Sequence, residues 1–193
     1  MKVIIVHGFG GIPNGGWFPW LMKELATRDI PAYSFLLPHT EDPVVDEWVK
    51  ALDTQLGCDM KGTILLGHSL GATGILRYLE QKGKNFTSRL QGVVLVSGLI
   101  ERLEVDDKKS IFRKLDSFVE PAISLSSLQD LADTFVVIHG KKDNIVPLFH
   151  AEKIARELKA RLEVIEDGDH FSQKSQPICY ELPKVLEVIL GIV

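Results

Sequence analysis

Short apolar runs alternate with amphipathic segments along the whole chain. Six runs rich in β-branched residues predict strands, because such side chains suit a pleated, buried surface; they lie at 2–7, 32–37, 63–66, 92–97, 134–139 and 161–166. Between them, apolar residues at helical spacing predict helices at 17–27, 44–56, 72–81, 148–158 and 177–190.

Some of the predicted strands are continuously apolar instead of alternating between apolar and polar residues. They include VVLV at 93–96 and FVVI at 135–138, which is typical of strands that are buried on both faces. Strand–helix alternation with such runs indicates an α/β protein, with a parallel sheet covered by helices on both sides. Ligands bind such a sheet beyond the carboxyl ends of its strands, so functional residues should follow strands.

One segment interrupts the alternation. Residues 101–130 are charged at first and then serine-rich, and we expect them to form a small, cap-like insertion of helical or irregular structure. No repeat, low-complexity tract or linker divides the sequence, and 193 residues suit one buried core. We therefore expect one domain spanning 1–193.

The composition and net charge argue against two classes of binding partner. The chain is 45% hydrophobic and 25% charged with a net charge of −4, so neither nucleic acid nor an anionic membrane is an expected partner. The uncharged stretch 3–22 contains glycines and prolines that argue against a membrane span, and it lacks the features of a signal peptide. Cys58 and Cys179 form no zinc or disulfide pattern. We expect reduced thiols and a cytoplasmic location, although a bridge between the two depends on their separation in space.

The most informative motif is the pentapeptide GHSLG at 67–71. It lies between a predicted strand and a predicted helix, which is the arrangement of a nucleophile elbow, a tight turn that holds a serine hydroxyl above the sheet. Such a turn crowds the backbone, so a Cβ at Gly67 or Gly71 would clash. The motif predicts Ser69 as the nucleophile of a serine hydrolase; the alternative is an ordinary serine in a glycine-rich turn.

A serine nucleophile needs a base, and histidine is the usual one because its unperturbed pKa lies near neutrality. His170 follows the last predicted strand, in DGDHF at 167–171, and is the candidate. The other histidines end strands, precede the nucleophile or lie in a predicted helix: His7, His39, His68, His139 and His150. The acid stands between serine and histidine in strand–helix hydrolases, which favours Asp143; Asp167 and Asp169 are its rivals.

An oxyanion hole requires two fixed donors for the negative charge that develops on the substrate carbonyl oxygen. One should be the backbone N–H of Leu70, directly after the nucleophile. The other should come from GFGG at 8–11, where we choose the Phe9 N–H, with Gly10 as the alternative. Trp17 and Phe171 are candidates for the wall of a substrate pocket, although a tryptophan at the start of a helix more often serves the core.

These residues together resemble the α/β-hydrolase superfamily and, more closely, the small YdeN-like serine hydrolases, which include the retinoblastoma-binding serine hydrolases of animals. The matching features are VIIVHG at 3–8, WFPWL at 17–21, GHSLG at 67–71, the Asp143 turn and GDHF at 168–171. The resemblance implies a three-layer α/β-hydrolase fold, with a mostly parallel sheet of about six strands and without the two leading antiparallel strands of larger relatives. It also implies a triad of Ser69, Asp143 and His170.

One departure concerns a partner. The animal relatives are associated with an L-x-C-x-E motif for retinoblastoma binding, whereas this chain has LGCDM at 56–60, with Met60 where the glutamate should stand. The binding motif is not intact, and that partner is not expected here.

The expected function is hydrolysis of small carboxylic esters through an acyl-Ser69 intermediate. No cofactor is expected, because the sequence contains neither H-E-x-x-H nor a phosphate-binding G-x-x-x-x-G-K-[ST]. Two alternatives stay open: a protein-binding module with a vestigial site, and a thioesterase, amidase or acyltransferase that uses the same triad. The sequence does not determine the natural substrate or the oligomeric state.

Overall fold

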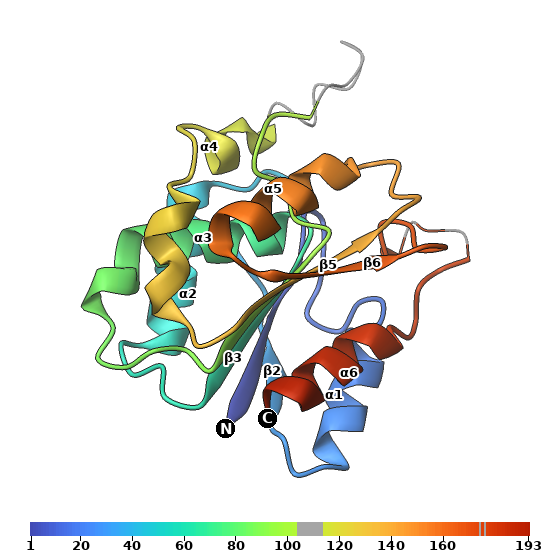
Figure 1. Ribbon diagram of the computed structural model, residues 1–193, viewed down its shortest axis with the longest axis horizontal. Coiled ribbons are helices and arrows are strands. Elements are labelled where there is room, and N and C mark those ends of the chain that lie inside the picture. The colour runs from blue at the N-terminus through green and yellow to red at the C-terminus, as the bar shows by residue number, and fades with distance from the viewer. Residues whose placement is uncertain (104–113, 174, 176) are drawn as a thin grey trace.

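A six-stranded parallel sheet forms the centre of the protein (Figure 1). The computed structural model describes residues 1–103, 114–173, 175 and 177–193. The strand order is β2-β1-β3-β4-β5-β6, and every pairing is parallel. The strands are β1 (Lys2–Val6), β2 (Ala32–Ser34), β3 (Thr63–His68), β4 (Gly92–Val96), β5 (Phe135–Gly140) and β6 (Arg161–Ile165). The predicted α/β-hydrolase fold is confirmed.

Helices cover both faces of this sheet (Figure 1). Those on one face are α2 (Val45–Leu56), α3 (Leu70–Lys82) and α5 (Leu148–Leu158), and those on the other are α1 (Phe18–Ala26) and α6 (Pro183–Ile192). Among the helices in the described part of the chain, none is both long enough and apolar enough to cross a bilayer.

The two faces of the sheet bury separate apolar clusters. In β3, Leu65 packs into the cluster beneath α2, α3 and α5, whereas Ile64 and Leu66 pack into the one beneath α1 and α6. Successive side chains of a strand point to opposite faces. A strand covered on both sides is therefore apolar at every position, which explains the continuous apolar runs of the sequence.

The chain between β4 and β5 contains α4 (Asp116–Val119) and the 3₁₀ helix η3 (Leu125–Leu131). The buried guanidinium of Arg77 ties this segment to α3: it donates to the carbonyls of Phe118, at 2.7 Å, and Pro121. Residues 104–113 of the expected insertion at 101–130 lie outside the described residues.

Several helix boundaries differ from those predicted, and the starts of α6 and α3 are two of them. α6 begins at Pro183 instead of residue 177, because a proline suits the first turn of a helix, where its missing N–H has no helical partner in any case. Apolar residues at 177–182 predicted a helical face there, but two of them, Ile178 and Tyr180, are exposed and do not pack against the sheet. α3 begins at Leu70 instead of residue 72, so the helix starts directly after the candidate nucleophile.

Candidate active site

Ser69 occupies a tight turn between β3 and α3, with φ 54° and ψ −124°. A Cβ on Gly67 would lie 2.5 Å from the Ala72 Cα, and one on Gly71 would overlap the carbonyl oxygen of Val6. The predicted steric need for glycine at both positions is confirmed. The Ser69 N–H donates to the Val96 carbonyl at 2.8 Å, which fixes the turn to the neighbouring strand.

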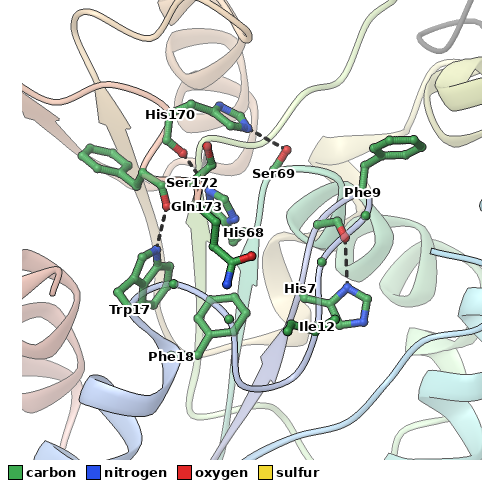
Figure 2. A pocket seen from close by; sticks show the side chains of 16 residues that line it. His7, Phe9, Ile12, Trp17, Phe18, His68, Ser69, His170, Ser172 and Gln173 are labelled. Atoms are coloured by element: carbon green, nitrogen blue, oxygen red, sulfur yellow. Dashed lines mark hydrogen bonds between the residues drawn. The ribbon is translucent and has the colours of Figure 1, made fainter. Parts of the chain in front are cut away.

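The structure brings Ser69, His170 and Asp143 together at the carboxyl edge of the sheet, each after a different strand. The Ser69 hydroxyl lies 2.9 Å from His170 Nε2 (Figure 2), and His170 Nδ1 lies 2.8 Å from Asp143 Oδ2. A carboxylate can only accept, so His170 carries its proton on Nδ1 and its Nε2 can accept the serine proton.

Asp143 is anchored from both sides of its carboxylate. Its Oδ1 accepts the N–H groups of Ile145 and Val146, both at 2.9 Å. Burial raises the pKa of this carboxyl, but the His170 hydrogen bond and charge and the two backbone donors outweigh burial, and the pKa is lowered overall. Asp143 therefore stays ionised and holds one tautomer of His170.

The rival aspartates make other contacts. Asp167 pairs with Lys142 at 2.6 Å on the surface, and Asp169 Oδ1 accepts the N–H of Phe171 at 2.8 Å. Of the three candidate acids, the structure places Asp143 against the imidazole.

The glycine loop (residues 8–11) passes against the nucleophile, since a Cβ on Gly8 would lie 2.9 Å from the Ser69 Cβ. The Gly10 N–H donates to the Thr40 carbonyl at 2.8 Å, whereas the Phe9 N–H has no hydrogen-bond partner among the described residues. The Leu70 N–H is the first of α3 and has no acceptor within the helix. This geometry favours Phe9 over Gly10, and the pair Phe9 and Leu70 stays the predicted oxyanion hole.

His7 holds the glycine loop in place. Its Nε2 accepts the Leu37 N–H at 3.0 Å, so its Nδ1 carries the proton and donates to the Gly8 carbonyl at 2.9 Å. Burial lowers the pKa of His7, which keeps the ring neutral. The residue therefore has a structural role.

A pocket of about 100 Å³ opens beside Ser69 (Figure 2). Its lining includes the predicted residues Trp17 and Phe171, together with Ile12, Phe18 and Gln173. The side chains of Trp17 and Phe171 are only 1% and 6% exposed. They therefore lie at the base of the pocket, where little of their surface is accessible.

The role of His68 could not be predicted from the sequence. His68 is not the base, but its Nε2–H donates to the carbonyl of His170 at 2.8 Å. The His68 ring lies edge-on to Trp17, with centroids 5.9 Å apart. Burial is the main cause that lowers its pKa to about 3, so the ring is neutral near pH 7. Gln173, on the pocket rim, was missed as well, and no sequence motif marks either residue.

His139 and His150 lie buried close to the acid. His139 Nε2 donates to the Val146 carbonyl at 2.8 Å and lies 3.6 Å from Asp143 Oδ2. His150 accepts the Ile100 N–H through Nδ1 at 3.3 Å, and burial lowers its pKa to about 4. Within the described residues, no group of three or more histidines, cysteines or carboxylates could hold a metal ion.

A parallel sheet with a serine at a strand–helix elbow, facing a histidine and a buried aspartate, defines an α/β hydrolase. The chain belongs to the family described as serine hydrolase, which matches residues 3–188. It is 30% identical to the YdeN hydrolase of Bacillus subtilis (strain 168) over 185 residues, 94% of this chain and 93% of that protein. It is 26% identical to the serine hydrolase RBBP9 of Rattus norvegicus over 194 residues, 98% of this chain and 95% of that one.

Comparison with solved structures agrees with this family assignment. The crystal structure of the B. subtilis ydeN gene product aligns with a TM-score of 0.87 and 29% identity, covering 99% of this chain and 97% of that chain. The monoacylglycerol lipase of Paleococcus ferrophilus aligns with a TM-score of 0.69 over 100% of this chain and 95% of that chain. Its identity is 16%, so this likeness concerns the fold alone.

Proposed function

We propose that this serine hydrolase cleaves small carboxylic esters through an acyl-Ser69 intermediate. The observation that carries the proposal is the pair of hydrogen bonds from Ser69 to His170, at 2.9 Å, and from His170 to Asp143, at 2.8 Å. A serine hydroxyl is a weak nucleophile until a base takes its proton, and this arrangement supplies the base in the required tautomer.

In the first half of the proposed reaction, Ser69 Oγ attacks the ester carbonyl carbon while His170 Nε2 takes the hydroxyl proton. The carbonyl π electrons move to oxygen, and the Phe9 and Leu70 N–H groups stabilise the oxyanion. The C–O bond to the alcohol then breaks, and His170 gives its proton to the departing oxygen. Asp143 stabilises the imidazolium between these two transfers.

In the second half, water enters where the alcohol stood. His170 takes a proton from the water as its oxygen attacks the acyl carbon, and the bond to Ser69 Oγ breaks as His170 returns the proton to the serine. The carboxylic acid leaves and the enzyme is restored. The same groups serve both halves, so no further reactant is required.

The volume of the pocket supports a small acyl group. About 100 Å³ is available beside Ser69, compared with roughly 300–1,000 Å³ in sites that enclose drug-sized ligands. The lining by Ile12, Phe18 and the glycine loop favours a short aliphatic chain. We expect kcat/KM to be lower for an octanoate ester than for a butyrate ester of the same alcohol.

A fluorophosphonate probe tests the nucleophile directly. Folded wild-type protein should form one adduct, which peptide mapping should place on Ser69, and Ser69→Ala should give no adduct and lose at least about 10³-fold in ester turnover. Full ester hydrolysis by Ser69→Ala would contradict the proposal. Failure of the probe to label folded wild-type protein would favour a binding module with an inactive site.

Competition among substrates tests the type of bond. An ester, a thioester and an amide with the same short acyl group should be turned over with the ester preferred. A higher kcat/KM for the thioester or the amide would retain the role of Ser69 and overturn the ester assignment.

A further inference from the structure

The loop that carries His170 (residues 166–173, the histidine loop) belongs to neither a helix nor a strand. Its base must nevertheless keep two hydrogen bonds at once, 2.9 Å to Ser69 and 2.8 Å to Asp143. A misplacement of about 1 Å can lower the rate of an enzyme by about 100-fold. The question is therefore what holds the backbone of the histidine loop.

We propose that Trp17 and His68 are positioning residues that hold His170 in place by donating hydrogen bonds to two successive backbone carbonyls. We call this pair of hydrogen bonds the clamp. This inference rests on the proposed role of His170 as the base. The His68 Nε2–H donates to the carbonyl of His170 at 2.8 Å, and the Trp17 Nε1–H donates to that of Phe171 at 3.0 Å. Both bonds are drawn in Figure 2.

The two donors come from parts of the chain that are remote from the loop and from each other. His68 ends β3, directly before the nucleophile, and Trp17 lies directly before α1, after the glycine loop. The bonds span 102 and 154 residues of sequence. The His68 bond consequently ties the loop that carries the base to the strand that carries the nucleophile. The Trp17 bond ties the same loop to the segment that follows the candidate oxyanion donor.

The direction of both bonds is fixed by chemistry. A carbonyl only accepts and an indole N–H only donates, so Trp17 must be the donor. The other partner of His170 is likewise a carbonyl, so His68 carries its proton on Nε2. The buried, neutral state of His68 agrees with this single tautomer.

Burial makes the clamp effective. Trp17 is 1% exposed and His68 is 8% exposed, so little water can replace either bond. The two rings meet edge to face at an angle of 79°, and each therefore restrains the other. The Phe171 backbone between them has φ 52°, a conformation that a phenylalanine adopts only when its surroundings impose it.

The test separates the hydrogen bonds from the packing of the rings. Trp17→Phe keeps an aromatic ring and removes the N–H. Its matched control is Trp20→Phe, because Trp20 packs against the same face of the sheet from α1 and its indole has no hydrogen bond within the described residues. His68→Met removes the other donor at similar length, whereas His68→Gln places an amide N–H close to the position of Nε2.

We expect Trp17→Phe and His68→Met each to lower kcat by about 10-fold to 100-fold, with KM changed less than about 2-fold. The rate of fluorophosphonate labelling of Ser69 should fall in parallel. Trp20→Phe and His68→Gln should stay within about 3-fold of wild type, and the second of these is the rescue that a purely structural role would not require. Thermal unfolding checks that each variant is folded.

A spectroscopic readout makes the clamp testable without turnover. The His170 Nδ1 proton, shared with Asp143, should give a low-field ¹H resonance in wild type, Trp20→Phe and His68→Gln. It should broaden or shift in Trp17→Phe and His68→Met. An unchanged resonance with unchanged kcat in both donor-deleted variants would overturn the clamp while leaving the role of Ser69 intact. If wild-type protein neither hydrolyses esters nor reacts with the probe, the proposed function fails, and the resonance still decides whether the clamp exists.

Discussion

The two edges of the sheet use left-handed backbone for different purposes. At the amino edge, Asp29 and Lys159 have φ values of 57° and 54°, are exposed, and lie where the chain passes from a helix to the next strand. At the carboxyl edge His39 is exposed as well, with a φ of 49°, but Ser69, Ser97 and Phe171 have φ values of 54°, 49° and 52° and are buried or half-buried. Glycine would serve the turns at the amino edge, whereas at the carboxyl edge particular side chains are kept in a conformation that they disfavour.

The buried histidines follow the same division. His7, His68, His139 and His150 are all 8% exposed or less, and each lies at or near the carboxyl edge. Ser97, at the end of β4, is fully buried, and its hydroxyl has no partner in the described structure. Backbone strain and buried unpaired groups both lower stability, and their concentration around Ser69 indicates that this edge is arranged for chemistry.

Asp143→Asn should give the largest effect. The carbonyl of the new amide would remain with the Ile145 and Val146 N–H groups, which leaves its NH₂ facing His170 Nδ1. His170 would then carry its proton on Nε2, toward Ser69, and could not accept the serine proton. We expect kcat to fall by about 10³-fold to 10⁴-fold with the fold preserved. Asp167→Asn, which changes a surface carboxylate of the histidine loop, is the matched control and should leave kcat unchanged. Equal losses in the two variants would refute the assignment of the acid.

Gly71→Ala should come next, because its Cβ would overlap the carbonyl oxygens of Val6 and His7. Backbone cannot give way as a flexible side chain can, so we expect a loss of about 3 kcal/mol in the free energy of unfolding, measured by denaturant titration. Gly191→Ala is the control: it lies in α6, and nothing lies within 4 Å of its added Cβ. It should raise the free energy of unfolding by about 0.5 kcal/mol. A stable, active Gly71→Ala protein would contradict the steric argument.

The features of the carboxyl edge that depend on local sequence pattern could be predicted from the sequence. Burial on both faces makes a strand apolar throughout, so β4 and β5 were found within a residue at each end. The elbow was recognisable because GHSLG lies between two apolar segments. Asp143 and His170 followed from the rule that functional residues come after strands, together with their order along the chain.

The parts that sequence analysis missed depend on contacts between distant segments. No local pattern marks His68 as a donor to a carbonyl 102 residues away, and its position beside the nucleophile argued only against its being the base. The start of α6 was misplaced for a related reason. Apolar spacing at 177–182 resembles a helix, but Pro183 sets the first turn, and the preceding side chains are largely exposed.

The stability of the protein should depend on pH through the buried His68. Burial lowers its pKa from 6.5, the ordinary value for histidine, to about 3 in the folded protein. Between these values the unfolded chain binds a proton that the native protein does not, so stability must fall as pH falls. The slope for this group is about 1.4 kcal/mol per pH unit. His68→Gln removes the titrating group, and its stability should decline less steeply than that of wild type between about pH 6 and pH 4. Parallel curves from denaturant titration would show that His68 is not buried in the neutral form.

The smallest effect should come from relieving strain at the amino edge. Lys159 ends α5 in the left-handed region, with φ 54° and ψ 37°, where a side chain is disfavoured and glycine is not. Lys159→Gly should therefore raise the free energy of unfolding by about 0.5 kcal/mol and leave ester turnover unchanged, because the residue lies at the end of the sheet opposite Ser69. Asp29→Gly should behave in the same way. Thermal unfolding and kcat measured on both variants test the comparison, since a loss of activity in either one would mean that the amino edge also supports the site.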